Sequence, residues 1–184
     1  MIYFTADTHF CHANIIKSCD RPFKDVKEMN QVLINNWNSR VRDCDEIYIL
    51  GDFLYRGTGN DANGILGRLK GRKYLITGNH DRYLEDSQFW PGAFEWIKDY
   101  HIIQHHGIKI VLFHFPMLSW YASHRGSIQL YGHVHNSGIQ HPEFGEKLKM
   151  LGPRAVNVGV DVHNFSPVSI NEIVDRIDGA LLPP

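Results

Sequence analysis

Several short polar clusters in this 184-residue chain contain residue types that bind metal ions. In chain order they are Asp7-Thr8-His9, Gly51-Asp52, Gly78-Asn79-His80-Asp81, His114 and Gly132-His133-Val134-His135. The chain has 12 histidines, and histidine is the commonest metal ligand in proteins. A mixed set of carboxylate, amide and imidazole donors without thiolates suits divalent ions such as manganese, iron or zinc. The clusters therefore predict chemistry that depends on a metal.

The number of donors favours two metal ions over one. About seven potential ligands are too many for a single closed tetrahedral site. They suit two metals about 3.5 to 4 Å apart that share a bridging carboxylate and a bridging water. Such a pair generates hydroxide at neutral pH and holds both oxygens of an in-line displacement at phosphorus. Hydrolysis of a phosphate ester fits this donor set.

Each polar cluster directly follows an apolar run that is typical of a strand buried on both faces. The five runs are Ile2–Ala6, Ile47–Leu50, Tyr74–Thr77, Ile108–Phe113 and Ile128–Tyr131. In open α/β sheets, ligands bind beyond the carboxyl ends of the strands. We therefore expect the five clusters to meet at one rim of the fold.

Helical patterns lie between the strands. Apolar residues recur at three- and four-residue intervals from Asp25 to Val41 and predict an amphipathic helix there. A last helix is expected over Ser169–Ile177, with Ser169 as its N-cap. Strand-helix-strand units of this kind favour the α/β class.

The remaining segments add detail to this class. Tyr100–His106, Gly107 and Ile108–Phe113 indicate a hairpin, which would make the strands mixed in direction. Arg154–Val160 is a further strand candidate, whereas Asn136–Pro153 shows no clear period and is expected to form a loop or a short hairpin. No repeat or linker divides the chain, so residues 1–184 are expected to form one domain.

Composition excludes several classes of protein. With 43% hydrophobic and 21% charged residues, the chain is typical of a globular protein rather than a disordered or fibrous one. The formal net charge of −1 and the lack of a long basic run disfavour a nucleic acid polymer as partner. No apolar stretch approaches the roughly 20 residues of a membrane span, so we expect a cytoplasmic protein without a membrane partner. Cys11, Cys19 and Cys44 lack CxxC spacing and are expected to be reduced thiols.

The ordered clusters resemble the signature of the calcineurin-like metallophosphoesterase superfamily, and the resemblance covers residues 7 to 135. It implies a four-layer α/β/β/α sandwich of two mixed sheets flanked by helices. It also implies two divalent metal ions, with manganese expected first and iron, zinc or nickel as alternatives. The short chain looks most like the compact single-domain prokaryotic or phage members.

The resemblance implies a role for each matching position. One metal would be held by Asp7, His9 and His135, the other by Asn79, His114 and His133, and Asp52 would bridge both. The resemblance implies that His80 protonates the leaving-group oxygen or stabilises charge on the phosphoryl group.

Departures from one branch of the superfamily narrow the expectation. The Ser/Thr protein phosphatases carry a GDxVDRG block whose second Asp supports the catalytic histidine, and Tyr55 replaces that Asp here. A protein phosphatase is therefore disfavoured. Arg56 keeps the position of a phosphate-contacting arginine, which suits its bidentate guanidinium. His12 and Arg21 are further candidates for substrate contacts, with a surface loop as the alternative place for Arg21.

The expected reaction is hydrolysis of a P–O bond in a small phosphate ester, by direct attack of a metal-bridging water or hydroxide. A phosphodiester is slightly preferred over a monoester, because no cationic cluster dense enough to hold a dianion is evident. The alternative is a non-catalytic metal-binding scaffold or interaction module of the same fold. The ligand positions and His80 are all present, which disfavours this alternative. The natural substrate and the oligomeric state stay open.

Overall fold

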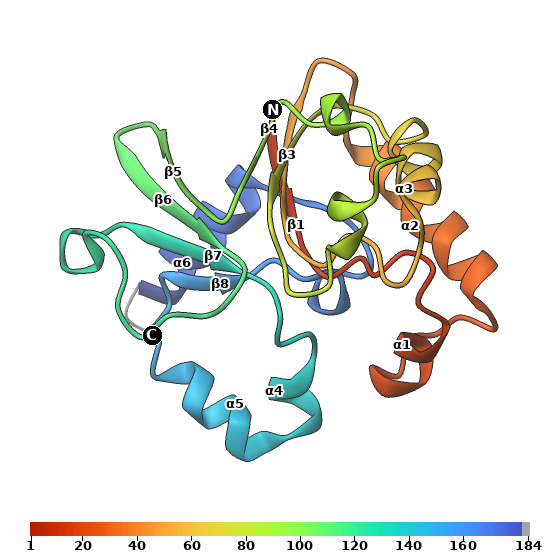
Figure 1. Ribbon diagram of the computed structural model, residues 1–184. Helices are drawn as coiled ribbons and strands as arrows, with labels where there is room; N and C mark the ends of the chain where they lie inside the picture. The colour runs from red at the N-terminus through yellow and green to blue at the C-terminus, as the bar shows by residue number, and fades with distance from the viewer. Residues whose placement is uncertain (182–184) are drawn as a thin grey trace.

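Two mixed β-sheets lie next to each other in the computed structural model, which describes residues 1–181, and helices flank them (Figure 1). Within these residues, one sheet has five strands in the order β4-β3-β2-β1-β9. The other has four strands in the order β5-β6-β7-β8. The predicted α/β class, with two mixed sheets flanked by helices, is confirmed.

The five-stranded sheet is mainly parallel. The strands β1 (Ile2–Thr5), β2 (Glu46–Leu50), β3 (Arg72–Ile76) and β4 (Trp96–Lys98) run in the same direction. The short strand β9 (Val168–Ser169) pairs antiparallel with β1. The predicted strands of this sheet are confirmed, while β4 and β9 are additional.

The four-stranded sheet contains the predicted hairpin. The antiparallel pair is β5 (Tyr100–His105) and β6 (Ile108–Phe113). The strands β7 (Ile128–Tyr131) and β8 (Ala155–Asn157) continue the sheet in parallel with β6. The strand predicted over 154–160 is present as β8 but is shorter, since it covers only Ala155–Asn157.

Two apolar cores stabilise the layers. Successive residues of a strand point to opposite faces. Ile47 and Ile49 of β2 accordingly pack toward the helices, and Tyr48 and Leu50 pack toward the second sheet. This burial on both faces is why the strand sequences are almost continuously apolar.

Three helices lie on the outer side of the five-stranded sheet (Figure 1). They are α1 (Ala13–Ser18), α2 (Val26–Arg40) and α3 (Gly59–Leu66). The predicted helix corresponds to α2, whose N-cap Asp25 accepts a hydrogen bond from the backbone N–H of Glu28 at 2.9 Å. The helix α3 was not predicted because its glycine and asparagine residues are weak helix formers.

The C-terminal helix α6 (Ile170–Leu181) begins directly after β9. Ser169 caps it as predicted, because its Oγ accepts from Glu172 N at 3.3 Å and its own N–H donates to the Glu172 carboxylate at 2.8 Å. Ile170, Ile173 and Ile177 pack into the core between the sheets.

The prediction of a loop or short hairpin over Asn136–Pro153 is wrong. This segment forms two helices, α4 (Ser137–Gln140) and α5 (Pro142–Lys149). Neither contains a fully buried residue, and with four and eight residues both are too short for a helical period to be recognised in the sequence. Short 3-10 turns complete the chain at η1 (Arg82–Glu85), η2 (Pro91–Ala93), η3 (Ser123–Arg125) and η4 (Val160–Val162).

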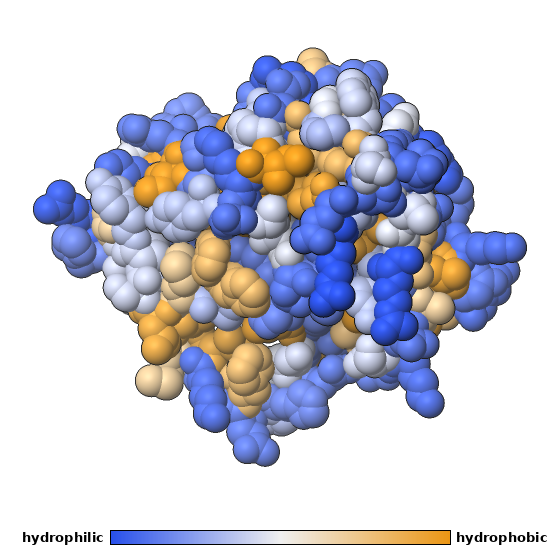
Figure 2. Space-filling view, in the orientation of Figure 1, coloured by the Kyte–Doolittle hydropathy of each residue, from blue (hydrophilic) through white to orange (hydrophobic). Residues whose placement is uncertain are grey.

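The surface is mostly hydrophilic, with separate hydrophobic areas on the face shown in Figure 2. The most exposed large apolar side chains are Met1, Trp90, Leu118, Ile139 and Met150. A search of residues 1–181 finds no helix with the length and apolar character that crossing a membrane requires.

Candidate metal centre

The five polar clusters meet in the structure, as the strand order predicts. Two groups of three residues have ligand atoms that lie within 4.8 Å of one another: Asp7, His9 and His135, and Asp52, His114 and His133. Asp7 and His9 follow β1 and His135 follows β7, whereas Asp52, His114 and His133 follow β2, β6 and β7. The sheets therefore assemble donors that are far apart in the sequence.

Asp52 lies between the two groups. Its Oδ2 is 3.4 Å from His9 Nε2, and its Oδ1 is 3.7 Å from His114 Nε2. Asn79 completes the set, because its Oδ1 lies 3.1 Å from His114 Nε2. All seven predicted ligands are thus brought together, with one carboxylate in the middle.

The backbone holds several of these residues in an unusual conformation. The φ angles of Asp7, His9, Asp52, His133 and His135 are 56°, 48°, 54°, 70° and 47°. Side-chain-bearing residues rarely adopt this left-handed region, and such strain concentrates at functional sites. The surrounding fold therefore stabilises loop conformations that turn these side chains toward one another.

Two glycines let the loops after β2 and β3 approach closely. A Cβ on Gly78 would lie 2.3 Å from both the backbone N and Oδ1 of Asp52. A Cβ on Gly51, whose φ is 83°, would lie 2.5 Å from His114 Nδ1. Larger residues at either position would displace a candidate ligand.

Asp81 ties the same two loops together. Its buried carboxylate accepts hydrogen bonds from the N–H groups of Gly78, Asp52 and Phe53 at 2.8, 2.9 and 2.8 Å. Burial raises the pKa of Asp81 to about 6. Asp81 thus anchors the backbone beneath Asp52.

Partners outside the ligand set orient two of the histidines. His114 Nδ1 lies 2.7 Å from the carbonyl oxygen of Leu50, so its Nε2 faces Asp52. His135 Nδ1 lies 2.8 Å from Oδ2 of Asp161. Partners of this kind fix the tautomer and the ring orientation of histidines that bind metals.

The role predicted for Arg21 needs correction. Its side chain is 0% exposed, and its Nε and Nη2 donate to the two carboxylate oxygens of Asp161 at 2.8 and 2.9 Å. It also donates to the backbone carbonyls of Thr8 and Asp7 at 3.0 and 2.8 Å. Because its side chain is buried and hydrogen-bonded, Arg21 is neither a surface residue nor open to a substrate. Its bonds instead support the loop that carries Asp7.

Asp161 is a further residue of the site that no sequence motif indicates. It lies in η4, beyond the residues that carry the family resemblance, and only the fold brings it to His135 and Arg21. Cys19, His135 and Asp161 also form a group of potential metal ligands. The carboxylate of Asp161 is already bonded to Arg21 through both oxygens, so this group is better described as a support for His135.

The protonation states of the cluster suit the binding of a cation. Burial raises the pKa of Asp7 to about 7 and lowers the pKa of His9 to about 4. Burial also acts to raise the pKa of Asp52, but the His9 and His114 rings outweigh it and bring this pKa to about 2. At neutral pH the centre thus holds an ionised Asp52 beside a neutral His9.

A metal ion fits these residues. In the described part of the chain, Oδ2 of Asp7 and both ring nitrogens of His9 are buried without a hydrogen-bond partner. Buried polar atoms nearly always have a partner, so such atoms require an explanation. A divalent cation would supply one, because carboxylate oxygens and neutral imidazole nitrogens are its usual ligands.

His80 and His12 lie beside this centre. His80 Nε2 is 4.0 Å from Asp52 Oδ2, and its side chain is 40% exposed. The ring of Tyr55 contacts His80 edge-on, with centroids 5.0 Å apart, and stacks on His12 at 3.7 Å. Burial lowers the pKa of His12 to about 4, so this ring is neutral near pH 7.

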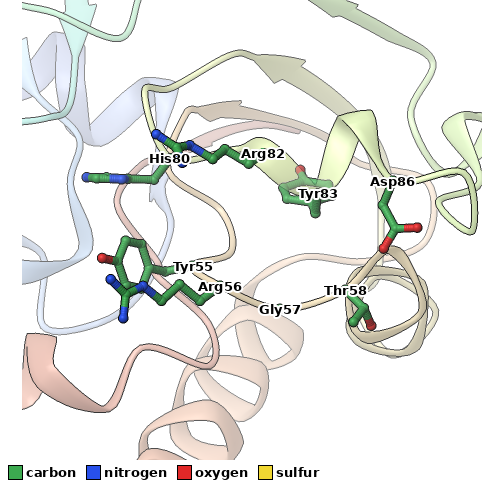
Figure 3. A pocket seen from close by; sticks show the side chains of 8 residues that line it. All are labelled: Tyr55, Arg56, Gly57, Thr58, His80, Arg82, Tyr83 and Asp86. Atoms are coloured by element: carbon green, nitrogen blue, oxygen red, sulfur yellow. The ribbon is translucent and has the colours of Figure 1, made fainter.

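A cavity of about 370 Å³ has His80 in its lining but none of the seven candidate ligands (Figure 3). It is lined by Tyr55, Arg56, Gly57, Thr58, His80, Arg82, Tyr83 and Asp86. Arg56, a predicted substrate residue, lies here. Arg82 was not predicted, since nothing in its sequence context distinguishes it from an ordinary surface arginine.

Known proteins show similarity across nearly the whole chain. Uncharacterized protein MJ1445 of Methanocaldococcus jannaschii is 39% identical over 179 residues, which cover 96% of this chain and 91% of that protein. The Gene 66 protein of Mycobacterium phage D29 is 29% identical over 208 residues, which cover 98% of this chain and 98% of that protein.

The crystal structure of AQ665 from Aquifex aeolicus, a protein of unknown function, superposes with a TM-score of 0.71 at 30% identity. The match covers 95% of this chain and 98% of that chain. The profile of the calcineurin-like phosphoesterases matches residues 1–137, a range that contains all seven predicted ligands and His80. From the ligand geometry and this match, we conclude that the chain belongs to the calcineurin-like phosphoesterase family.

Proposed function

We propose that the protein is a dinuclear metal-dependent phosphoesterase that hydrolyses P–O bonds in small phosphate esters. The position of Asp52 is the main support. Its two carboxylate oxygens face different histidines, His9 at 3.4 Å and His114 at 3.7 Å, and these belong to the two ligand groups. One carboxylate between two donor sets is the arrangement that a pair of bridged metals requires.

Asp7, His9 and His135 would hold one divalent ion, Asn79, His114 and His133 the other, and Asp52 would bind both. Two such ions, when bound, supply a water of lowered pKa and stabilise negative charge on the phosphoryl group. Oxygen and imidazole donors favour manganese, with iron, zinc or nickel as alternatives.

His80 is the proposed general acid. It lies at the exposed side of the centre, and its ring is restrained by the edge-on contact with Tyr55. From there it would donate a proton to the leaving-group oxygen as the P–O bond breaks, a contribution worth about 10²- to 10⁴-fold in rate. Water attacks phosphorus directly in this scheme, without a phosphorylated enzyme.

A phosphodiester is the preferred substrate in this proposal. Arg21, the buried arginine beside the ligands, is already engaged, because it donates to Asp161, to two backbone carbonyls and to Met29 Sδ. The other arginines nearby, Arg56 and Arg82, line the cavity beside His80, and none of the seven candidate ligands lines that cavity. A second negative charge on the reacting phosphate would therefore have no guanidinium partner among the ligands. A diester carries only one such charge.

The test compares bis-p-nitrophenyl phosphate with p-nitrophenyl phosphate as substrates of chelator-treated protein, with and without manganese. We expect manganese-dependent hydrolysis with the diester preferred. Asp52→Asn should reduce the rate by at least about 100-fold, because loss of a supporting partner alone costs 10- to 100-fold. Asp43→Asn is the matched control, since this exposed carboxylate precedes β2 at the end opposite Asp52.

Two results would reject the proposal. One is protein that binds no divalent metal. The other is an Asp52→Asn variant that hydrolyses esters as fast as the wild type. Bound metal without hydrolysis of any ester would instead favour the scaffold alternative.

A further inference from the structure

We propose that the cavity beside His80 binds a second phosphate, carried by the leaving group of the substrate, through Arg56 and Arg82. This inference rests on the proposed phosphoesterase function and names the class of substrate. The class is a phosphate ester whose departing alcohol bears its own phosphate.

The cavity is large enough for such a group and lies on the side of the leaving group. Its volume of about 370 Å³ is within the range of roughly 300 to 1,000 Å³ that small-molecule sites occupy. His80 belongs both to this cavity and to the neighbourhood of Asp52. A general acid must be within hydrogen-bond reach of the oxygen that it protonates. The leaving group therefore extends from the metal centre into this cavity.

The two arginines lie at the same end of the cavity as His80. Figure 3 shows the Arg82 guanidinium beside the His80 ring and the Arg56 guanidinium in front of Tyr55. Asp86 and Thr58 lie at the opposite end in the same view, with Tyr83 between. A group that leaves past His80 thus meets two guanidinium groups first.

Neither arginine has an acidic partner among the described residues. The ion pairs that arginines form there involve Arg21, Arg40 and Arg72. Asp86, the one acidic residue that lines the cavity in the described structure, accepts from the backbone N–H groups of Gly59 and Gln88 at 2.7 and 2.9 Å. The positive charge beside His80 is therefore not neutralised by the protein.

Local structure holds both arginines in place relative to the centre. The Arg56 guanidinium carbon lies 5.2 Å from the centroid of the Tyr55 ring, and the φ angle of Arg56 is 54°. Tyr55 is itself stacked on His12 at 3.7 Å. Arg82 begins η1, and its backbone N–H donates to the carbonyl of His80 at 2.7 Å. The loops that carry Asp52 and His80 thus also carry the two cations.

The chemistry of the guanidinium group selects the ligand. Arginine presents planar, always charged donors that match phosphate oxygens in pairs, and two arginines without counterions suit a dianion. The reacting phosphate occupies the metal centre, so the anion in the cavity belongs to the other side of the scissile bond. A neutral or purely apolar leaving group would give the two guanidinium groups no anionic partner.

Two matched pairs of substrates test the inference with manganese-loaded enzyme. The first pair is ethylene glycol bisphosphate and 2-hydroxyethyl phosphate, which differ by one phosphate on the leaving group. The second compares a thymidine dinucleotide with its 5′- and 3′-phosphorylated forms, so that nucleotide and simple alkyl sources are distinguished. We expect kcat/KM to be about 10- to 100-fold higher for a phosphorylated member, the effect of charge-assisted hydrogen bonds.

Substitutions of the two arginines test whether the preference for the phosphorylated substrate arises in this cavity. Arg82→Gln and Arg56→Gln should each reduce the ratio of kcat/KM between the members of a pair toward one. Arg42→Gln, an exposed arginine that precedes β2, should leave the ratio as it is in the wild type. Both cavity arginines are exposed, so thermal unfolding of the variants should match the wild type.

The outcomes separate this inference from the function on which it rests. Hydrolysis of all substrates with equal kcat/KM would overturn the second-phosphate site and leave the phosphoesterase proposal intact. A preference that persists in both arginine variants would also overturn it. No hydrolysis of any ester by metal-loaded protein would overturn both proposals together.

Discussion

Nδ1 of His135 lies 2.8 Å from Oδ2 of Asp161, so one ring nitrogen of a proposed metal ligand is already occupied. Burial acts to lower the pKa of His135, but Asp161, Cys19 and the charge of Asp7 outweigh it and raise this pKa to about 10. Loss of the ring proton on metal binding would leave Nδ1–H directed at Asp161 and the lone pair of Nε2 available. Arg21 fixes Asp161 in turn through two hydrogen bonds. The three side chains thus form a support that sets the direction of one ligand.

Asp161→Asn should weaken metal binding at this ligand group by about 10- to 100-fold, the usual effect of losing such a partner. An amide does not hold the imidazole in one tautomer as a carboxylate does. Manganese affinity measured by titration against a competing chelator gives the change. Asp43→Asn serves as the exposed control, and an unchanged affinity in Asp161→Asn would contradict the orienting role.

The double variant Arg21→Met with Asp161→Leu separates orientation from folding stability. Removing one partner leaves a buried charge unpaired, whereas replacing both charges by apolar groups is often neutral or stabilising. The double variant loses the Arg21 hydrogen bonds to the Thr8 and Asp7 carbonyls but leaves no buried charge unpaired, so it should be more stable than Asp161→Leu alone. If Asp161 orients His135, the double variant should still bind manganese as weakly as Asp161→Leu does. Recovery of wild-type affinity would show that the pair serves folding alone.

His80→Ala should lower kcat according to the leaving group. An alkoxide needs a proton as it departs, so alkyl esters should lose about 10²- to 10⁴-fold. A p-nitrophenolate departs readily without one, so p-nitrophenyl esters should lose much less. Metal content measured beside the kinetics should equal that of the wild type. An equal loss for both kinds of ester would mean that His80 acts on the phosphoryl group and not as the general acid.

Gly78→Ala should destabilise the protein and reduce metal binding. The added Cβ would lie 2.3 Å from Asp52 N and Oδ1, so the candidate bridging residue must move. Such overpacking costs about 1 to 3 kcal/mol. Urea unfolding measures the loss. Gly64→Ala in α3 is the matched control, because nothing lies within 4 Å of its Cβ and the change should stabilise the helix by about 0.5 to 1 kcal/mol.

The ligand cluster could be predicted because local sequence and sheet geometry carry the same information. Each ligand block follows a strand such as β1 or β2, which is apolar because both of its faces are buried. Strand ends in an α/β sheet share one rim, so the blocks had to converge. The strands and the long helix α2 were recognisable for the same reason, since burial imposes a pattern.

Residues that act through tertiary contacts could not be predicted in this way. Arg21 and Asp161 are 140 residues apart, and neither belongs to a motif that would reveal their pairing. The free charge of Arg82 beside His80 depends on which acidic groups lie nearby, which only the fold decides. The helices α4 and α5 have only four and eight residues, so the sequence offers too few turns in which a period could be recognised.

Asp7 makes the stability of the metal-free protein depend on pH. Burial raises its pKa from 3.8 to about 7. Between these values the folded state binds a proton that the unfolded state has lost, so this residue makes the free energy of unfolding fall as the pH rises. Above pH 7 the carboxyl is ionised in both states, and the destabilisation is constant.

Asp7→Asn removes this destabilisation, so the metal-free variant should be more stable than the wild type at pH 8, by on the order of 1 kcal/mol or more. The difference should shrink toward zero near pH 4, where the carboxyl is protonated in the folded wild type. Urea unfolding of chelator-treated proteins at pH 4, 6 and 8 measures it, with Asp43→Asn as a control that should differ little from the wild type at each pH. Added manganese should reverse the order, because a ligand stabilises the folded state that binds it and the variant lacks one donor. Equal free energies of unfolding for the metal-free wild type and the variant at pH 8 would contradict the raised pKa of Asp7. If manganese stabilised the variant as much as it stabilises the wild type, Asp7 would not be a metal ligand.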